Sequence, residues 1–207
     1  MTIREIVEQR NITRLFHFTH VDNLSSILVN GLMSRSELDK STSKYDYNDE
    51  DRIDGHLDAI CVSISFPNSR MFYKYRMLKP GNWAVLEITP SVLWDKNCAF
   101  YPTNAASNNV RFNDPDLMKG SEAFADLFLD NIFGIQRDEG LLAKYPTDVQ
   151  AEVLVFESIP PQCIVNTFHP NKESAEYFKN RHPETNQRYY ANIKGRTLYS
   201  QRHYCLG

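Results

Sequence analysis

Hydrophobic and polar positions along the chain follow two periods, one of two residues that is typical of strands and one near 3.6 residues that is typical of helices. The first period predicts strands over residues 15–20, 59–66, 83–88, 150–156 and 162–168. The second predicts helices over residues 3–10, 22–30, 71–78, 92–94, 121–128 and 171–181. Because strands and helices are intermixed in this order, the pattern favours an α+β fold.

The segments between these elements are polar. Residues 34–58 are mostly acidic and predict a loop, or a loop that holds a short helix. Residues 100–116 are irregular and rich in Asn, Pro and Ser, and residues 134–149 form a loop that leads into the strand at 150–156. The C-terminal residues after 181 are polar, with Tyr and Arg interspersed.

The composition restricts the class of protein and its partners. A length of 207 residues suits one domain, and 42% hydrophobic residues are enough for a core. The net charge of -3 gives no overall attraction to nucleic acid, so such a partner must bind a local patch. The four scattered cysteines argue against a zinc site or a disulfide framework and favour a reducing compartment. A charged N-terminus and the lack of an apolar run of ~18 residues predict a cytoplasmic protein without a membrane partner.

Several well-known motifs are missing from the sequence. It contains no G-x-x-x-x-G-K-[ST] and no G-x-G-x-x-G, which argues against phosphate binding by a Gly-rich loop. It also lacks the H-E-x-x-H of zinc proteases and the G-x-S-x-G of hydrolases. The chemistry therefore has to come from polar residues at the ends of the predicted strands.

Glu152 is the anomaly of the strand at 150–156. Strand alternation places Gln150, Glu152 and Leu154 on one face, so a single carboxylate lies on an otherwise apolar strand. Burying an unpaired charge is costly, and such a residue is usually exposed at a rim, paired or functional. A solvated Glu at a strand end is the ordinary alternative.

The first strand ends in polar residues before a helix begins. His17, Thr19, His20 and Asn23 gather around this strand end, which is a common place for a ligand site. Two structural alternatives stay open. His17 could be a core histidine bonded to the backbone, and Asn23 could be only a helix N-terminal residue.

The order of these features resembles the ADP-ribosyltransferase fold, with a first-strand His, a central strand–helix unit and a late-strand Glu. It resembles most closely the DarT family of toxins, which ADP-ribosylate bases in single-stranded DNA. The resemblance is carried by residues 16–28, 51–53, 66–68, 71–73, 104–106 and 150–155. It covers residues 14–167 of a single domain over 1–207 and leaves 168–207 as a C-terminal appendage.

The resemblance implies a split mixed or antiparallel sheet with flanking helices, and NAD+ as co-substrate without a metal. Cleavage of the nicotinamide–ribose bond passes through an oxocarbenium-like state, as in glycoside hydrolysis. A carboxylate beside the ribose stabilises that cation and accepts a proton from the nucleophile. We expect Glu152 to take both roles. Arg52 is expected to contact the NAD+ diphosphate and assist the reaction, because a guanidinium binds phosphate bidentately.

The remaining site residues follow from the same resemblance. The expected NAD+-binding residues are His17, Thr19, Asn23, Arg52, Ser65, Phe66 and Tyr73. Of Tyr73 and Tyr75 on one predicted helix, we expect one in the core and the other free to stack on a ring. The expected nucleic-acid contacts are Tyr45, Asn104, Arg137, Lys144 and Gln150. The C-terminal Tyr and Arg residues either contact DNA as well or only pack as an appendage.

The function expected from these residues is ADP-ribosylation of a base, thymidine or guanosine, in single-stranded DNA. The resemblance also implies that the protein is a toxin. Its partner would be an antitoxin that removes ADP-ribose, either of macrodomain type or of another type. The same chemistry on RNA, simple NAD+ hydrolysis, and a non-catalytic nucleic-acid-binding module are the alternatives. Single-stranded DNA is preferred over duplex because the weakly basic surface should grip few phosphates.

Overall fold

The computed structural model describes residues 1–40, 55–190 and 196–205. Within these ranges the main sheet has seven strands in the order β4-β7-β2-β1-β3-β8-β9. Neighbours are antiparallel except for β8 and β9, which are parallel. The strands are β1 (Leu15–His20), β2 (Ile60–Ile64), β3 (Trp83–Ile88), β4 (Cys98–Tyr101), β7 (Glu152–Val155), β8 (Ile164–His169) and β9 (Gln187–Tyr189). A separate hairpin pairs β5 (Asn131–Ile132) with β6 (Ile135–Gln136).

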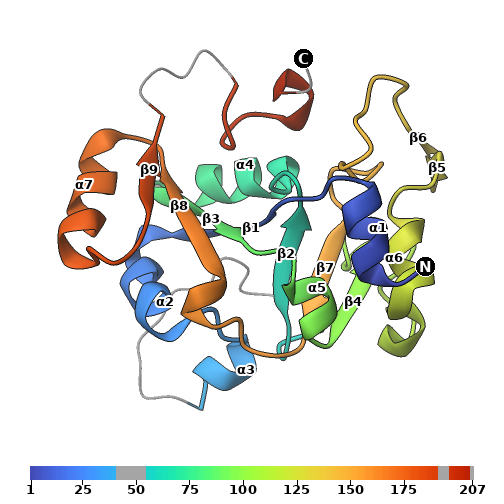
Figure 1. The fold of residues 1–207 in the computed structure, drawn as a ribbon, viewed down its shortest axis with the longest axis horizontal. Helices are drawn as coiled ribbons and strands as arrows, with labels where there is room; N and C mark the ends of the chain where they lie inside the picture. Colours follow the sequence, from blue (N-terminus) through green and yellow to red (C-terminus); the bar gives the residue numbers. More distant parts are fainter. Residues whose placement is uncertain (41–54, 191–195, 206–207) are drawn as a thin grey trace.

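Helices flank this sheet, which confirms the α+β prediction. They are α1 (Ile3–Gln9), α2 (Leu24–Asn30), α3 (Arg35–Leu38), α4 (Ser69–Leu78), α5 (Val92–Asp95), α6 (Gly120–Asp126) and α7 (Lys172–Arg181). In Figure 1, α4 and the C-terminal segment lie at the top of the molecule, and α2 and α3 lie at the bottom. None of the helices in the described ranges combines the length and the hydrophobicity needed to cross a bilayer.

The sheet is split between β1 and β2. These two strands pair only at Leu15↔Ile64 and Phe16↔Ser63, whereas β1 pairs with β3 along all six of its residues. The three strands β4, β7 and β2 therefore form one half of the sheet, and β1, β3, β8 and β9 form the other. Beyond Phe16 the two halves are no longer joined by this ladder, as the resemblance predicts.

Apolar side chains fill both faces of the sheet because strands alternate their side chains. One cluster joins Leu15, Leu86 and Val153 to the apolar sides of α1, α2, α5 and α6. On the opposite face of β1 and β3, Phe16 and Val85 pack against α4. The polar side chains of Thr19 and Glu152 lie near strand ends.

Two predicted boundaries are wrong. The strand predicted at 59–66 ends at Ile64, because Ser65 has a φ of 60° and Phe66 N–H donates back to Ile64 O at 2.7 Å. The segment predicted to be irregular from residue 100 begins with the end of β4, whose pairing partner β7 is about fifty residues away. A four-residue strand with so distant a partner leaves little periodic signal in the sequence.

The C-terminal segment packs onto α4 and the sheet. The Tyr199 hydroxyl lies 2.8 Å from Trp83 O and 2.7 Å from Phe168 O, so it can donate to either carbonyl. Arg76 of α4 donates to Tyr199 O at 2.7 Å. Burial raises the pKa of Tyr199 well above its ordinary value. These contacts support the alternative that the segment packs as part of the domain.

Candidate active site

Glu152 lies at the start of β7 with its side chain buried, at 4% exposure. Asn104 Nδ2 donates to its Oε1 at 3.3 Å, and the backbone N–H of Ala105 donates to its Oε2 at 2.9 Å. Hydrogen bonds to both oxygens favour the charged carboxylate and fix its orientation. The alternative of a solvated Glu at a strand end is therefore wrong.

The turn that supplies these two donors follows β4. Tyr101, the last residue of β4, is the register partner of Glu152. Asn104 Oδ1 accepts from Ala106 N at 2.9 Å, and Asn104 O accepts from Ser107 N at 2.8 Å. One amide side chain thus closes its own turn and bonds the carboxylate, which ties the position of Glu152 to the shape of the turn.

The loop before Glu152, residues 134–149, is held from inside by its own Arg137. Its guanidinium donates to Tyr145 O at 2.9 Å, to Leu142 O at 3.0 Å and to Thr147 Oγ1 at 3.1 Å. Burial lowers the pKa of Arg137. A planar group that donates in several directions can hold a loop without regular structure in one conformation.

The same loop is held from outside by the C-terminal segment and by the turn that follows β4. Arg202 donates to Pro146 O at 2.7 Å and to Thr147 O at 3.0 Å. Burial lowers the pKa of Arg202 to about 10. Asp148, itself buried, accepts from Thr103 Oγ1 at 2.7 Å. Segments that are far apart in the sequence therefore converge on the residues that precede Glu152.

His17 marks the split on the other side of β2. Its Nδ1 lies 2.8 Å from Cys61 O, and because a carbonyl only accepts, Nδ1 carries the proton. Cys61 is next to Val62, which pairs with Val153, the residue after Glu152. His17 thus contacts β2 from one side, and β7, which begins with Glu152, pairs with β2 from the other.

The polar end of β1 is tightly bonded. Thr19 is buried at 1% exposure, and its Oγ1 accepts from Asn23 Nδ2 at 3.3 Å. His20 Nδ1 lies 3.0 Å from Asp22 Oδ2, and its ring meets Trp83 edge-on. Asn23 is the N-cap residue of α2, as the structural alternative expects, although its side chain makes no capping hydrogen bond.

The chain that carries this buried carboxylate and this histidine is also similar to known proteins. The family model described as ssDNA thymidine ADP-ribosyltransferase, DarT, matches residues 16–199. The chain belongs to the DarT family. The match runs past residue 167 and into the C-terminal segment that packs on α4.

Solved DarT structures share the fold. Thermosipho africanus DarTG in complex with ADP-ribose is 18% identical with a TM-score of 0.61, over 90% of this chain and 51% of that one. Thermus sp. 2.9 DarT in complex with carba-NAD+ is 17% identical with a TM-score of 0.57, and the match covers 86% of this chain and 93% of that one. Thermus sp. 2.9 DarT in complex with ADP-ribosylated ssDNA is 15% identical with a TM-score of 0.55, and the match covers 88% of this chain and 95% of that one. The chain thus spans about half of the DarTG chain and nearly all of the Thermus DarT chain. A search of the curated proteins gives no match.

Within this DarT-family fold the predicted residues fall into separate groups. Asn104 contacts Glu152 directly. Ser65, Phe66 and Lys144 line one cavity. Tyr73 is 52% exposed on α4, whereas Tyr75 is buried, so the expectation that one of the pair is a core residue is confirmed.

Two of the expected nucleic-acid contacts are engaged within their own loop. Arg137 donates to loop carbonyls, as described above, and the Gln150 backbone N–H donates to Asp148 Oδ1 at 2.9 Å. Their contact with DNA remains a prediction, as does that of Asn104. Arg52 and Tyr45 lie outside the described residues.

Four residues that hold Glu152 or the loop before it were not given this role from the sequence: Thr103, Ala105, Asp148 and Arg202. Ala105 contributes only a backbone N–H, which leaves no trace in residue type. Asp148 and Thr103 are 45 positions apart, and Arg202 is 55 or 56 positions from its acceptors. A buried Asp two residues before Gln150 looks like any loop Asp until its partner is known.

Proposed function

We propose that this DarT-family chain transfers ADP-ribose from NAD+ to a base in single-stranded DNA. The observation that carries the proposal is Glu152, a buried carboxylate oriented by Asn104 and Ala105 beside the split of the sheet. Burying a carboxylate costs free energy, so a residue without a role is rarely buried and oriented by two hydrogen-bond donors in this way. A non-catalytic module would have no need of it.

The chemistry assigned to Glu152 balances in one exchange. The bond between the nicotinamide nitrogen and ribose C1′ breaks, and its electron pair leaves with nicotinamide. A nitrogen of the target base forms the new bond to C1′ and loses a proton. Glu152 stabilises positive charge at the ribose as it develops and accepts that proton.

The residues assigned to NAD+ lie mainly on the other half of the sheet. His17, held by the contact between its Nδ1 and Cys61 O, is assigned to a ribose hydroxyl of NAD+. Asn23 offers an amide at the same end of β1, positioned by Thr19. Arg52 is assigned to the diphosphate, and Tyr73, exposed on α4, to stacking. The set contains donors, acceptors and a cation, which is the chemistry that a dinucleotide requires.

Thymidine is the base that we propose first, because the matching family model is described by that substrate. Guanosine is the second candidate. We also assign the chain a toxin role with a macrodomain-type antitoxin. This chain spans 51% of Thermosipho africanus DarTG, which leaves room in that protein for a further domain, and that structure holds ADP-ribose.

The test is incubation of labelled NAD+ with single-stranded DNA, duplex DNA, RNA or no acceptor. Single-stranded oligonucleotides that lack thymine or guanine then identify the base. The expected result is label on single-stranded DNA, lost when thymine is omitted. Label on RNA alone, or release of nicotinamide without any labelled acceptor, would replace this proposal by one of its two alternatives.

A further inference from the structure

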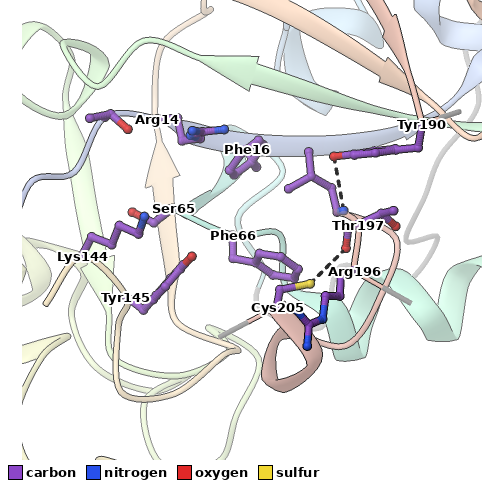
Figure 2. A pocket seen from close by; sticks show the side chains of 12 residues that line it. Arg14, Phe16, Ser65, Phe66, Lys144, Tyr145, Tyr190, Arg196, Thr197 and Cys205 are labelled. Carbon is purple, nitrogen blue, oxygen red and sulfur yellow. Dashed lines mark hydrogen bonds between the residues drawn. The ribbon is translucent and has the colours of Figure 1, made fainter. Parts of the chain in front are cut away.

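A cavity of about 190 Å³ lies between the start of β1, the loop before Glu152 and the C-terminal segment. Figure 2 shows Lys144 and Tyr145 on one side of it, Arg196 and Thr197 on the other, and Phe66 between them. Neither Glu152 nor His17 is among the residues described in its lining. The cavity is therefore a place next to the proposed reaction centre, not the centre itself.

The lining is strongly cationic. Arg14, Lys144 and Arg196 contribute three positive charges, and no carboxylate occurs among the lining residues that the structure describes. None of the three forms an ion pair with a described residue. In a chain of net charge -3, such a local excess of positive charge favours an anionic ligand.

Aromatic rings and hydroxyl groups complete the wall of the cavity. Tyr145 and Phe66 present aromatic surface, and the Lys144 ammonium lies 5.2 Å from the centre of the Tyr145 ring. The Ser65 side chain is buried and its Oγ has no hydrogen-bond partner among the described groups. Cations interleaved with aromatic rings are typical of surfaces that bind single-stranded nucleic acid.

The cavity lies close to Glu152. Phe16, which lines the cavity, is the register partner of Ser63 in β2. Val62 pairs with Val153, so Glu152 is level with Ser63 one strand away. The volume is below the range of about 300–1,000 Å³ that encloses a drug-sized ligand. It suits one unit of a longer ligand better than a whole dinucleotide.

We propose that this cavity binds the nucleotide next to the reacting base of single-stranded DNA. Arg14, Lys144 and Arg196 bind its phosphate groups, and Tyr145 and Phe66 contact its base. Phe66 is thereby assigned to DNA and not to NAD+, for which the resemblance had suggested it. The proposal rests on the proposed function and deepens it. It also gives the C-terminal segment a part in substrate binding, because Arg196 belongs to that segment.

The test measures binding of a fluorescent single-stranded oligonucleotide without NAD+, so that no modification takes place. The double variant Arg14→Ala/Arg196→Ala removes two exposed charges. Each lost phosphate contact should reduce the slope of log K against log salt by about 0.7, so affinity at 0.15 M salt should fall roughly tenfold. Lys144→Ala should add a further, smaller loss. NAD+ affinity should stay within about twofold.

The matched control is Arg4→Ala/Lys172→Ala, which removes two exposed charges from α1 and α7 and should leave the slope unchanged. Oligonucleotides shortened one nucleotide at a time should abolish the difference between wild type and double variant once the bound nucleotide is removed. An unchanged slope in the double variant, or weaker NAD+ binding with intact DNA binding, would overturn the proposal. If the wild type itself did not bind the oligonucleotide, the choice of DNA in the proposed function would fail as well.

Discussion

The two halves of the sheet are stabilised in different ways on either side of the split. At the end of β1, Thr19 bonds to Asn23 four residues on, whereas the contact of His17 with Cys61 O spans 44 positions. In the other half, both identified donors to Glu152 come from a distant segment, 47 or 48 positions away. The Thr19–Asn23 part of the proposed NAD+ site is thus locally encoded, whereas His17 and the proposed catalytic carboxylate depend on the assembled fold.

The largest effect should come from Glu152→Gln, which removes the charge and keeps the shape. The rate of transfer to DNA should fall by about 10²–10⁴, the usual contribution of a positioned acid–base group. NAD+ affinity should change little, because the His17 half is intact. Since Gln has only one oxygen for two donors, the free energy of unfolding should also fall by about 1–3 kcal/mol. Denaturant unfolding measured beside the rate separates the two effects, and a near-native rate would remove Glu152 from the mechanism.

Asn104→Ala tests whether the turn positions the carboxylate. It removes one hydrogen bond to a charged acceptor, worth about 1.5–3 kcal/mol, so kcat should fall roughly 10- to 150-fold. KM for NAD+ should be nearly unchanged. Asn108→Ala, at an exposed position of the same loop, is the control and should keep kcat. Direct reading of the base by Asn104 would instead appear as an altered sequence preference or a raised KM for DNA.

Arg202→Ala tests the hold of the C-terminal segment on the loop. Two carbonyls, Pro146 O and Thr147 O, lose their donor, and stability should fall by about 1–3 kcal/mol. We expect a smaller loss of kcat, of about tenfold or less, because Arg137 still holds the loop from inside. Arg70→Ala is the matched control, since Arg70 is exposed on α4 and close enough to lower the pKa of Arg202. Equal losses in both variants would show a general charge effect.

The smallest effect should come from His17→Ala, and it should have the opposite kinetic character. One neutral hydrogen bond to NAD+ is worth about 0.5–1.5 kcal/mol, so the dissociation constant for NAD+ should rise roughly 2- to 13-fold. Calorimetric titration with NAD+ measures this directly. DNA affinity should not change. An unaltered NAD+ affinity would return His17 to the alternative of a core histidine bonded only to the backbone.

The difference between local and long-range contacts also decides which features could be predicted from the sequence. The mixed fold class, the strand of Glu152 and the unit around His17 were predicted because periodicity and neighbouring polar residues are local signals. The end of β2 was misplaced because nothing in the residue type Ser65 announces a φ of 60°. Asp148, Thr103 and Arg202 were missed because a buried polar residue and its distant partner become recognisable only together.

The central claim is tested most directly by the intact mass of one thymine-containing oligonucleotide, incubated with the enzyme and NAD+ either alone or annealed to its complement. A duplex hides the pairing atoms of the base, and extruding a base costs a few kcal/mol. The account predicts that the single strand gains the mass of one ADP-ribose and that the annealed strand is modified far more slowly. Equal modification of both forms, or of neither, would contradict it.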